Sequence, residues 1–259
     1  MRSLDGYRRY LGVVRSLLDA ALDDRVTAAV AVAADLIVDR ILDGRVVYAF
    51  GASHAGLLVQ DQFYRAGGLV PIQPILPSCL MLNVTPVTAT SSLEQTSGVA
   101  EEILKDVAIG EGDLLLIVSV SGRNAVPVEM CTIAQQRGAT VIALTNIAYS
   151  SSVNGRGVPR LFEVADVVID LPGAVGDAAI FVSEDVPPVG PTSSAVGAAI
   201  LHALMVEAVT LLAGRGATPP VFASANLDDS AAWNEEWIGI YRDRLDYLSR
   251  IPFQPTTSM

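Results

Sequence analysis

The stretch Asp113-Leu114-Leu115-Leu116-Ile117-Val118, continued by Ser119-Val120-Ser121-Gly122-Arg123-Asn124, decides the fold class of this chain. The first half is apolar at every position after Asp113, which is typical of a strand buried on both faces of a parallel sheet. The second half is a turn of small and hydroxyl-bearing residues, followed by a helix that we expect to begin near Val126. The first turn of a helix has unpaired amide donors and a partial positive charge, and small residues let an anion come close. The stretch therefore predicts a phosphate-binding turn at the end of a strand.

The alternation of buried strands and helices extends over most of the chain. Further strands are expected over residues 45–50, 70–75, 140–145 and 166–170, and helices over 54–66, 93–107, 126–136 and 195–212. Residues 4–42 predict two leading helices with a break at 23–25, and the segments 76–92 and 172–191 contain enough proline, glycine and hydroxyl residues to be loops. Strands of this kind form a parallel sheet covered by helices on both sides, an α/β three-layer sandwich, with the ligand at the carboxyl ends of the strands.

The chain is expected to form one domain over residues 1–259, because no linker or internal repeat divides it. The core would span about 26–214, with a leading helix over 1–25 and a C-terminal aromatic helix over 226–250. That last helix has an aromatic stripe, which either packs on the domain or a second subunit or stacks on a ligand. Its members are Trp233, Trp237, Tyr241 and Tyr247.

Composition excludes several classes of function. The net charge is -11, so neither nonspecific nucleic-acid binding nor docking on an anionic membrane is expected. The N-terminus lacks a basic-then-apolar signal segment, and Cys79 and Cys131 have neither metal-ligand nor disulfide-framework spacing. The turn at 51–56 lacks the Gly-x-Gly-x-x-Gly fingerprint of dinucleotide binding. We therefore expect a cytoplasmic protein that uses neither a metal nor a cofactor.

Two further hydroxyl-rich turns of this kind precede expected helices. Gly51-Ala52-Ser53-His54 follows the first strand, and Gly190-Pro191-Thr192-Ser193-Ser194 precedes the long apolar helix. A single Ser-x-Ser-Gly could be an ordinary capping turn. Three hydroxyl-rich helix starts beside one sheet favour a phosphorylated ligand.

The order of these three motifs resembles the SIS (sugar isomerase) domain, specifically its single-domain group near the phosphoheptose isomerases and the N-acetylmuramic acid 6-phosphate etherases. The likeness covers about residues 26–214. It implies a five-stranded, flavodoxin-like parallel sheet, a phosphorylated sugar as ligand, and a homodimer or homotetramer with sites near subunit boundaries. The family often has Ser or Thr where Asn124 stands, which implies a shifted ligand. The phosphate or ligand residues implied by the resemblance are Gly51, Ser53, His54, Ser119, Ser121, Gly122, Arg123, Asn124, Thr192, Ser193 and Ser194.

Proton transfer beside a carbonyl needs an acid and a base, and the candidates are Glu94, His202 and His54. His202 resembles in its spacing the histidine of phosphoheptose isomerases, or is a histidine packed in an apolar helix. His54 binds the ligand or caps a helix, and Glu94 resembles loosely in place the acid of the etherases, or is a carboxylate favoured by a helix dipole. Glu129 faces either the site or solvent.

One departure from the family bears on the reaction. Phosphoheptose isomerases have a catalytic Glu in the helix after the first turn, where this chain offers only Asp61 and Gln62. We expect an enzyme that isomerises a phosphosugar between its aldose and ketose forms. A non-catalytic phosphosugar-sensing regulator, and a lyase or etherase acting on an amino-sugar phosphate, remain alternatives.

Overall fold

The computed structural model of the protein describes residues 4–248. Its centre is a five-stranded parallel sheet of the predicted kind, with the strand order β2-β1-β3-β4-β5. The strands are β1 (Val47–Gly51), β2 (Ile72–Ile75), β3 (Leu114–Val118), β4 (Thr140–Thr145) and β5 (Val167–Asp170). Every neighbouring pair is parallel, so all five carboxyl ends lie at one edge.

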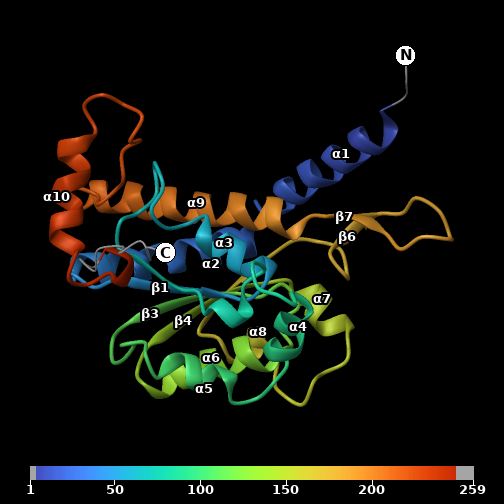
Figure 1. Cartoon of the computed structure of the whole chain (residues 1–259). Coiled ribbons are helices and arrows are strands. Elements are labelled where there is room, and N and C mark those ends of the chain that lie inside the picture. Colours follow the sequence, from blue (N-terminus) through green and yellow to red (C-terminus); the bar gives the residue numbers. More distant parts are fainter. Residues whose placement is uncertain (1–3, 249–259) are drawn as a thin grey trace, which may run out of the picture.

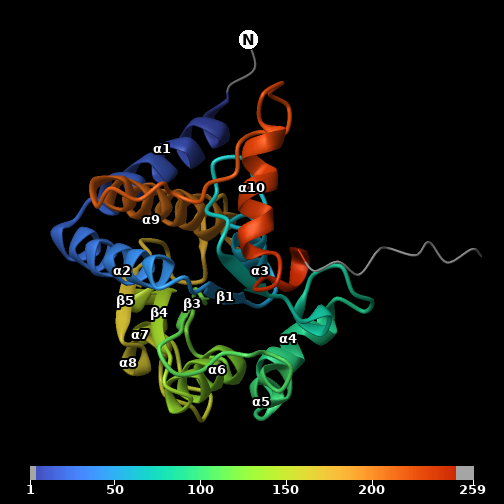
Figure 2. The ribbon, with the colours of Figure 1, turned by 90° about the vertical axis from the view of Figure 1, so that its left-hand side faces the viewer.

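Helices cover both faces of the sheet, and the result is the predicted α/β three-layer sandwich (Figures 1 and 2). One layer holds α2 (Asp24–Leu42), α3 (His54–Gln60) and α9 (Ser193–Gly214), and the other holds α4 (Thr88–Glu94), α5 (Val99–Leu104), α6 (Ala125–Gln136) and α8 (Leu161–Val164). The side chains of β3 alternate between the two cores: Leu114 and Leu116 point into the first and Leu115 and Ile117 into the second. This double burial explains the continuous apolar run of the strand.

Helix α9 also has the length and apolar composition of a membrane-spanning segment, with a mean hydropathy of 2.0. It packs against α2 over the sheet, and Leu201 and Leu204 are fully buried there. Its apolar character is therefore accounted for by its place in the core.

Several predicted boundaries were wrong. The helix expected over 54–66 ends at Gln60, because Tyr64 adopts a positive φ of 47° and packs edge-on against Phe222 and Tyr247. The helix expected over 93–107 is interrupted, since Gly98 is left-handed with φ 86° and caps the start of α5. The segment expected to be a loop before it contains the 3-10 helix η1 (Ser78–Leu80) and most of α4.

The second expected loop, 172–191, contains a small antiparallel pair, β6 (Ala178–Ile180) and β7 (Val189–Pro191). Two further helices connect or precede the sheet elements: α7 (Ile147–Ser152) follows β4, and α1 (Asp5–Ala20) precedes α2. Asp23 separates α1 from α2 and caps α2 through the N–H of Arg25, as the predicted break requires.

The C-terminal aromatic residues pack on the domain. Helix α10 (Ala231–Tyr241) is shorter than the predicted 226–250, of which 249 and 250 lie outside the described residues. Tyr241 is buried with Val46, Val70 and Phe222, and the turn η2 (Asp246–Leu248) follows. The packing alternative for the aromatic stripe is thus the one that the structure supports for Tyr241.

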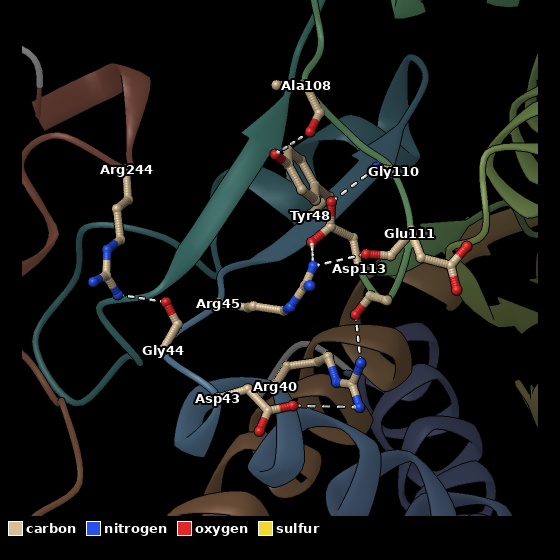
Figure 3. A network of polar contacts seen from close by, with 11 residues as sticks. Arg40, Asp43, Gly44, Arg45, Tyr48, Ala108, Gly110, Glu111, Asp113 and Arg244 are labelled. Carbon is tan, nitrogen blue, oxygen red and sulfur yellow. Dashed lines mark hydrogen bonds and ion pairs between the residues drawn. The ribbon is translucent and has the colours of Figure 1, made fainter.

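The opposite, amino-terminal edge of the sheet is closed by a polar network (Figure 3). The Asp113 carboxylate accepts a hydrogen bond from Arg45 at 2.8 Å and one from the Gly110 N–H at 2.9 Å, while Arg45 also donates to the Glu111 carbonyl. Arg40 donates to the Gly112 carbonyl in the same loop. These contacts tie the loop before β3 to β1 and α2 at the edge opposite the serine turns.

Candidate functional site

The first two predicted motifs meet at the carboxyl edge of the sheet. Strands β1 and β3 are neighbours, with Gly51 opposite Val118. Ser53 and Ser119 therefore leave the sheet side by side, and Ser119 is 95% buried with its N–H donated to the Leu144 carbonyl. The structure thus brings the two serine turns to one place.

Ser53 has a strained backbone conformation. Its φ of 51° and ψ of -122° fall in a region that residues with a side chain rarely adopt, at a cost of about 1–3 kcal/mol. Its N–H donates to the Leu80 carbonyl at 2.8 Å, and its hydroxyl is buried without a hydrogen-bond partner among the described residues. A strained serine with an unsatisfied hydroxyl at a strand end is an arrangement expected of a ligand-binding group.

Gly51 makes this turn possible. A Cβ at this position would lie 2.5 Å from the carbonyl oxygen of Ala55. The oxygen belongs to the backbone of α3, so it cannot move aside without opening the turn. The structure therefore places Gly51 as the residue that allows strand and helix to approach closely.

The turn after β3 presents free backbone donors. Gly122 has φ 54°, and a Cβ there would lie 2.7 Å from the Thr145 hydroxyl oxygen, so only glycine fits. Asn124 precedes α6 in an extended conformation, and its side chain does not cap the helix. Pro127 has no N–H, so the open donors of the first turn are the amides just before it. Ser150, missed in the sequence, lies under Gly122, and its buried hydroxyl has no hydrogen-bond partner within residues 4–248.

Glu94 lies at the same corner. It is the last residue of α4 and lies near the side chain of Asn124, whose Oδ1 accepts a hydrogen bond from Arg156. Burial raises the pKa of the Glu94 carboxyl, while the Asn124 side chain and the Arg156 charge lower it by less. The predicted acid therefore sits beside the predicted phosphate turn, with a raised proton affinity. Arg156 belongs to a loop of Asn, Gly and Arg residues without a recognisable pattern.

The third hydroxyl-rich helix start is already occupied. The Asp177 carboxylate accepts from the N–H groups of Thr192 and Ser193 at 3.0 and 2.8 Å, and from the Ser193 hydroxyl at 2.8 Å. Ser194 is exposed on the first turn of α9. Asp177 has φ 69° and comes from the loop before β6, so the sequence held no signal for this contact. In this structure a carboxylate of the chain itself fills the position that the motif predicted for phosphate.

The two histidines have different surroundings. His54 begins α3 directly after Ser53 and is exposed at the same edge. His202 lies on α9, with Nε2 2.7 Å from Asp61 Oδ2 and 3.2 Å from Arg65 Nη1. Helices α9 and α4 cover opposite faces of the sheet, so one chain does not bring His202 to Glu94 (Figure 1).

Two remaining candidates have structural contacts. Glu129 accepts a hydrogen bond from the N–H of Gly98 at 2.8 Å and so caps α5. Arg123 donates to the carbonyl of Asn154 at 3.0 Å. Within residues 4–248, no three His, Cys, Asp or Glu side chains are grouped to hold a metal ion.

A strand-turn-helix site of this kind, at the rim of a five-stranded parallel sheet, agrees with the comparison with known families. The SIS domain matches residues 9–146, just over half of the chain. The chain therefore belongs to the SIS domain family.

Relatives with higher sequence identity are UPF0309 proteins. The chain is 45% identical over 218 residues to a UPF0309 protein of Shouchella clausii, covering 83% of this chain and 89% of that one. It is 40% identical over 221 residues to a UPF0309 protein of Oceanobacillus iheyensis, covering 85% and 90%.

Solved structures share the fold at low sequence identity. A phosphoheptose isomerase from Francisella tularensis matches with a TM-score of 0.53 and 17% identity, covering 80% of this chain and 98% of that one. The phosphoheptose isomerase of Neisseria gonorrhoeae gives a TM-score of 0.53 with 16% identity and the same coverage. These likenesses show a common SIS fold.

Proposed function

We propose that the protein binds a phosphorylated sugar at the carboxyl edge of the sheet and isomerises it between aldose and ketose forms. The observation that carries this proposal is Ser53, whose strained backbone holds a buried, unpartnered hydroxyl next to the β3 turn. In this proposal the phosphate is held by the hydroxyls of Ser53, Ser119 and Ser121 and by the amides of 122–124. The phosphoheptose isomerases with the same fold support a phosphosugar as the ligand class.

In this proposal, local geometry binds the phosphate although the overall negative charge of the protein repels it. The protein has a net charge of -11, which repels a dianion at long range. At the uncapped start of α6, however, unpaired amides and the helix dipole attract an anion. Hydrogen bonds to a charged oxygen are also about twice as strong as those between neutral groups.

The reaction needs one group that moves a proton between neighbouring carbons. As base, the Glu94 carboxylate would take the proton from C2 of the aldose, which leaves an enediolate, and would return it to C1 to give the ketose. A raised pKa suits this role, because it makes the carboxylate a stronger base than an exposed one. His54, at the same edge, would pass a proton between the O1 and O2 oxygens.

We also propose that the active form is a homodimer in which a second copy covers α1. This amphipathic helix buries none of its residues, and Leu11 and Leu18 are exposed. An apolar groove of about 450 Å³ lies between α1, α2 and α9, lined by Leu18, Leu22, Val26 and Ala203 among others. An apolar helix face and groove of this size indicate a protein contact.

Replacing Leu11 by Asp is expected to convert a dimer into a monomer, because the carboxylate would be buried in the apolar contact. Light scattering after size exclusion measures the mass. The matched control is Asp in place of Leu227, which is equally apolar and 65% exposed but belongs to the loop before α10 and does not line the groove. A wild-type monomer, or a dimer that survives L11D, would refute the proposed contact.

Thermal shift tests the binding proposal. A ligand that binds only the folded state stabilises it by about 2.7 kcal/mol at 100 times its Kd. Glucose 6-phosphate, taken as probe, is expected to raise the melting temperature of the wild type, whereas glucose is not. The double variant S119A/S121A should lose the shift, and the control S152A, an exposed serine on α7, should keep it. Equal shifts of the melting temperature with glucose 6-phosphate and with glucose would contradict the proposal.

A further inference from the structure

Three arginines surround the predicted phosphate turn. Arg156 and Arg160 lie on the loop 153–160, and Arg123 belongs to the turn itself. The loop and the turn are joined, because the Leu161 N–H donates to the Gly122 carbonyl at 2.8 Å. We call these three residues the arginine cluster.

The arginine cluster has no matching carboxylates. Among residues 4–248, no Asp or Glu oxygen lies within 4.0 Å of a side-chain nitrogen of any of the three. What distinguishes the cluster is its position, because three cations gather beside one turn in a chain that has 28 acidic and only 17 basic side chains. A group of this kind creates a positive potential at the turn.

The cluster also retains unused donors. Arg123 donates to the Asn154 carbonyl and Arg160 to the Val153 carbonyl, while Arg156 donates to Asn124. A guanidinium has five N–H donors in a planar fork, so most of them remain. The Nη1 atom of Arg160 is buried and has no partner among the described residues. A buried donor without an acceptor costs about 1–3 kcal/mol, which a bound anion would recover.

We propose that the arginine cluster is a second anion-binding subsite, and that the ligand carries a carboxylate in addition to its phosphate. This inference rests on the proposed function, because it assumes that the phosphate occupies the serine turn. The planar guanidinium fork matches a carboxylate in two-point geometry. Asn124 connects the subsite to the reaction centre, since it accepts a hydrogen bond from Arg156 and its side chain lies near Glu94. The amide that stands in place of the family's hydroxyl at position 124 thereby links the arginine cluster to the Glu94 carboxyl.

A matched pair of ligands tests the subsite. 6-Phosphogluconate and sorbitol 6-phosphate are open chains that differ only at C1, a carboxylate in the first and an alcohol in the second. Calorimetric titration of the wild type is expected to give at least about tenfold tighter binding of the first, equivalent to about 1.4 kcal/mol. R156Q should bring the ratio close to one while it leaves the affinity for sorbitol 6-phosphate within about twofold.

Two further variants complete the experiment. R123Q is a second probe of the cluster and should also lower the ratio. R25Q removes the same charge from an exposed position at the start of α2 and should change neither affinity. If the wild type binds both ligands equally, or if R156Q weakens both equally, the second subsite is refuted and the phosphate proposal stands. If neither ligand nor glucose 6-phosphate binds, the proposed function itself fails.

Discussion

Alanine in place of Gly51 is expected to destabilise the folded protein by at least about 3 kcal/mol, the range of severe backbone clashes in a core. The added Cβ would lie 2.5 Å from the Ala55 carbonyl oxygen and 2.6 Å from its carbon. Relief requires that α3 move away from the end of β1. That movement would open the core that Leu58 and Val59 share with the sheet and would shift Ser53 out of place.

Urea unfolding of G51A measures this loss. The matched control is G239A, because Gly239 lies inside α10 with no heavy atom within 4 Å of its added Cβ. That change should be neutral or should stabilise by up to about 1 kcal/mol, since alanine has the higher helix propensity. Equal unfolding midpoints for the two variants would show that the turn after β1 is not as tight as the structure has it.

Replacing Glu94 by Gln is expected to lower turnover by about 10²- to 10⁴-fold, the usual contribution of a positioned general base. Gln keeps the size and shape of the side chain, but it cannot take a proton. Binding of glucose 6-phosphate should stay within a few fold. Exchange of the C2 hydrogen of the sugar phosphate for deuterium in D2O, followed by NMR, measures the proton step directly.

The same exchange experiment tests the pH dependence of the reaction and the alternative functions of the protein. Burial raises the pKa of Glu94, so activity should fall as the pH drops through that raised pKa, and the fall should begin at a higher pH than for an exposed Glu. E101Q, at an exposed carboxylate of α5, should keep full activity. Binding without any exchange in the wild type would instead indicate a sensor, and release of a leaving group would indicate a lyase or etherase.

Much of the fold could be predicted from the sequence, because a buried strand is recognised from the apolar run of its own residues. The run 114–118 is apolar throughout, since each of its residues faces one of two cores, and the turn that follows it needs glycine at 122. The same reasoning predicted a turn at residues 51–54, whereas the backbone strain at Ser53 became visible only in the structure. The chain after α3 depends instead on contacts with distant residues such as Tyr247, which no local pattern reveals.

The candidate site was predictable in part for the same reason. Strand order places Ser53 beside Ser119, and parallel sheets place both at the carboxyl edge. Asp177 and Arg156 reach their partners from irregular loops, so their roles depend on the tertiary fold alone. His202 illustrates the converse: its spacing along α9 resembles that of the family, yet in one chain it pairs with Asp61 across the sheet from Glu94.

The location of the phosphate is the claim on which the account depends, and backbone amide NMR tests it most directly. On titration with glucose 6-phosphate, the account predicts that the amide signals of 121–124 and of Ser53 shift, and that glucose leaves them unchanged. Shifts confined to Thr192 and Ser193 would show that the ligand displaces Asp177 and sits at α9. That result, or no shift at all, would contradict the account.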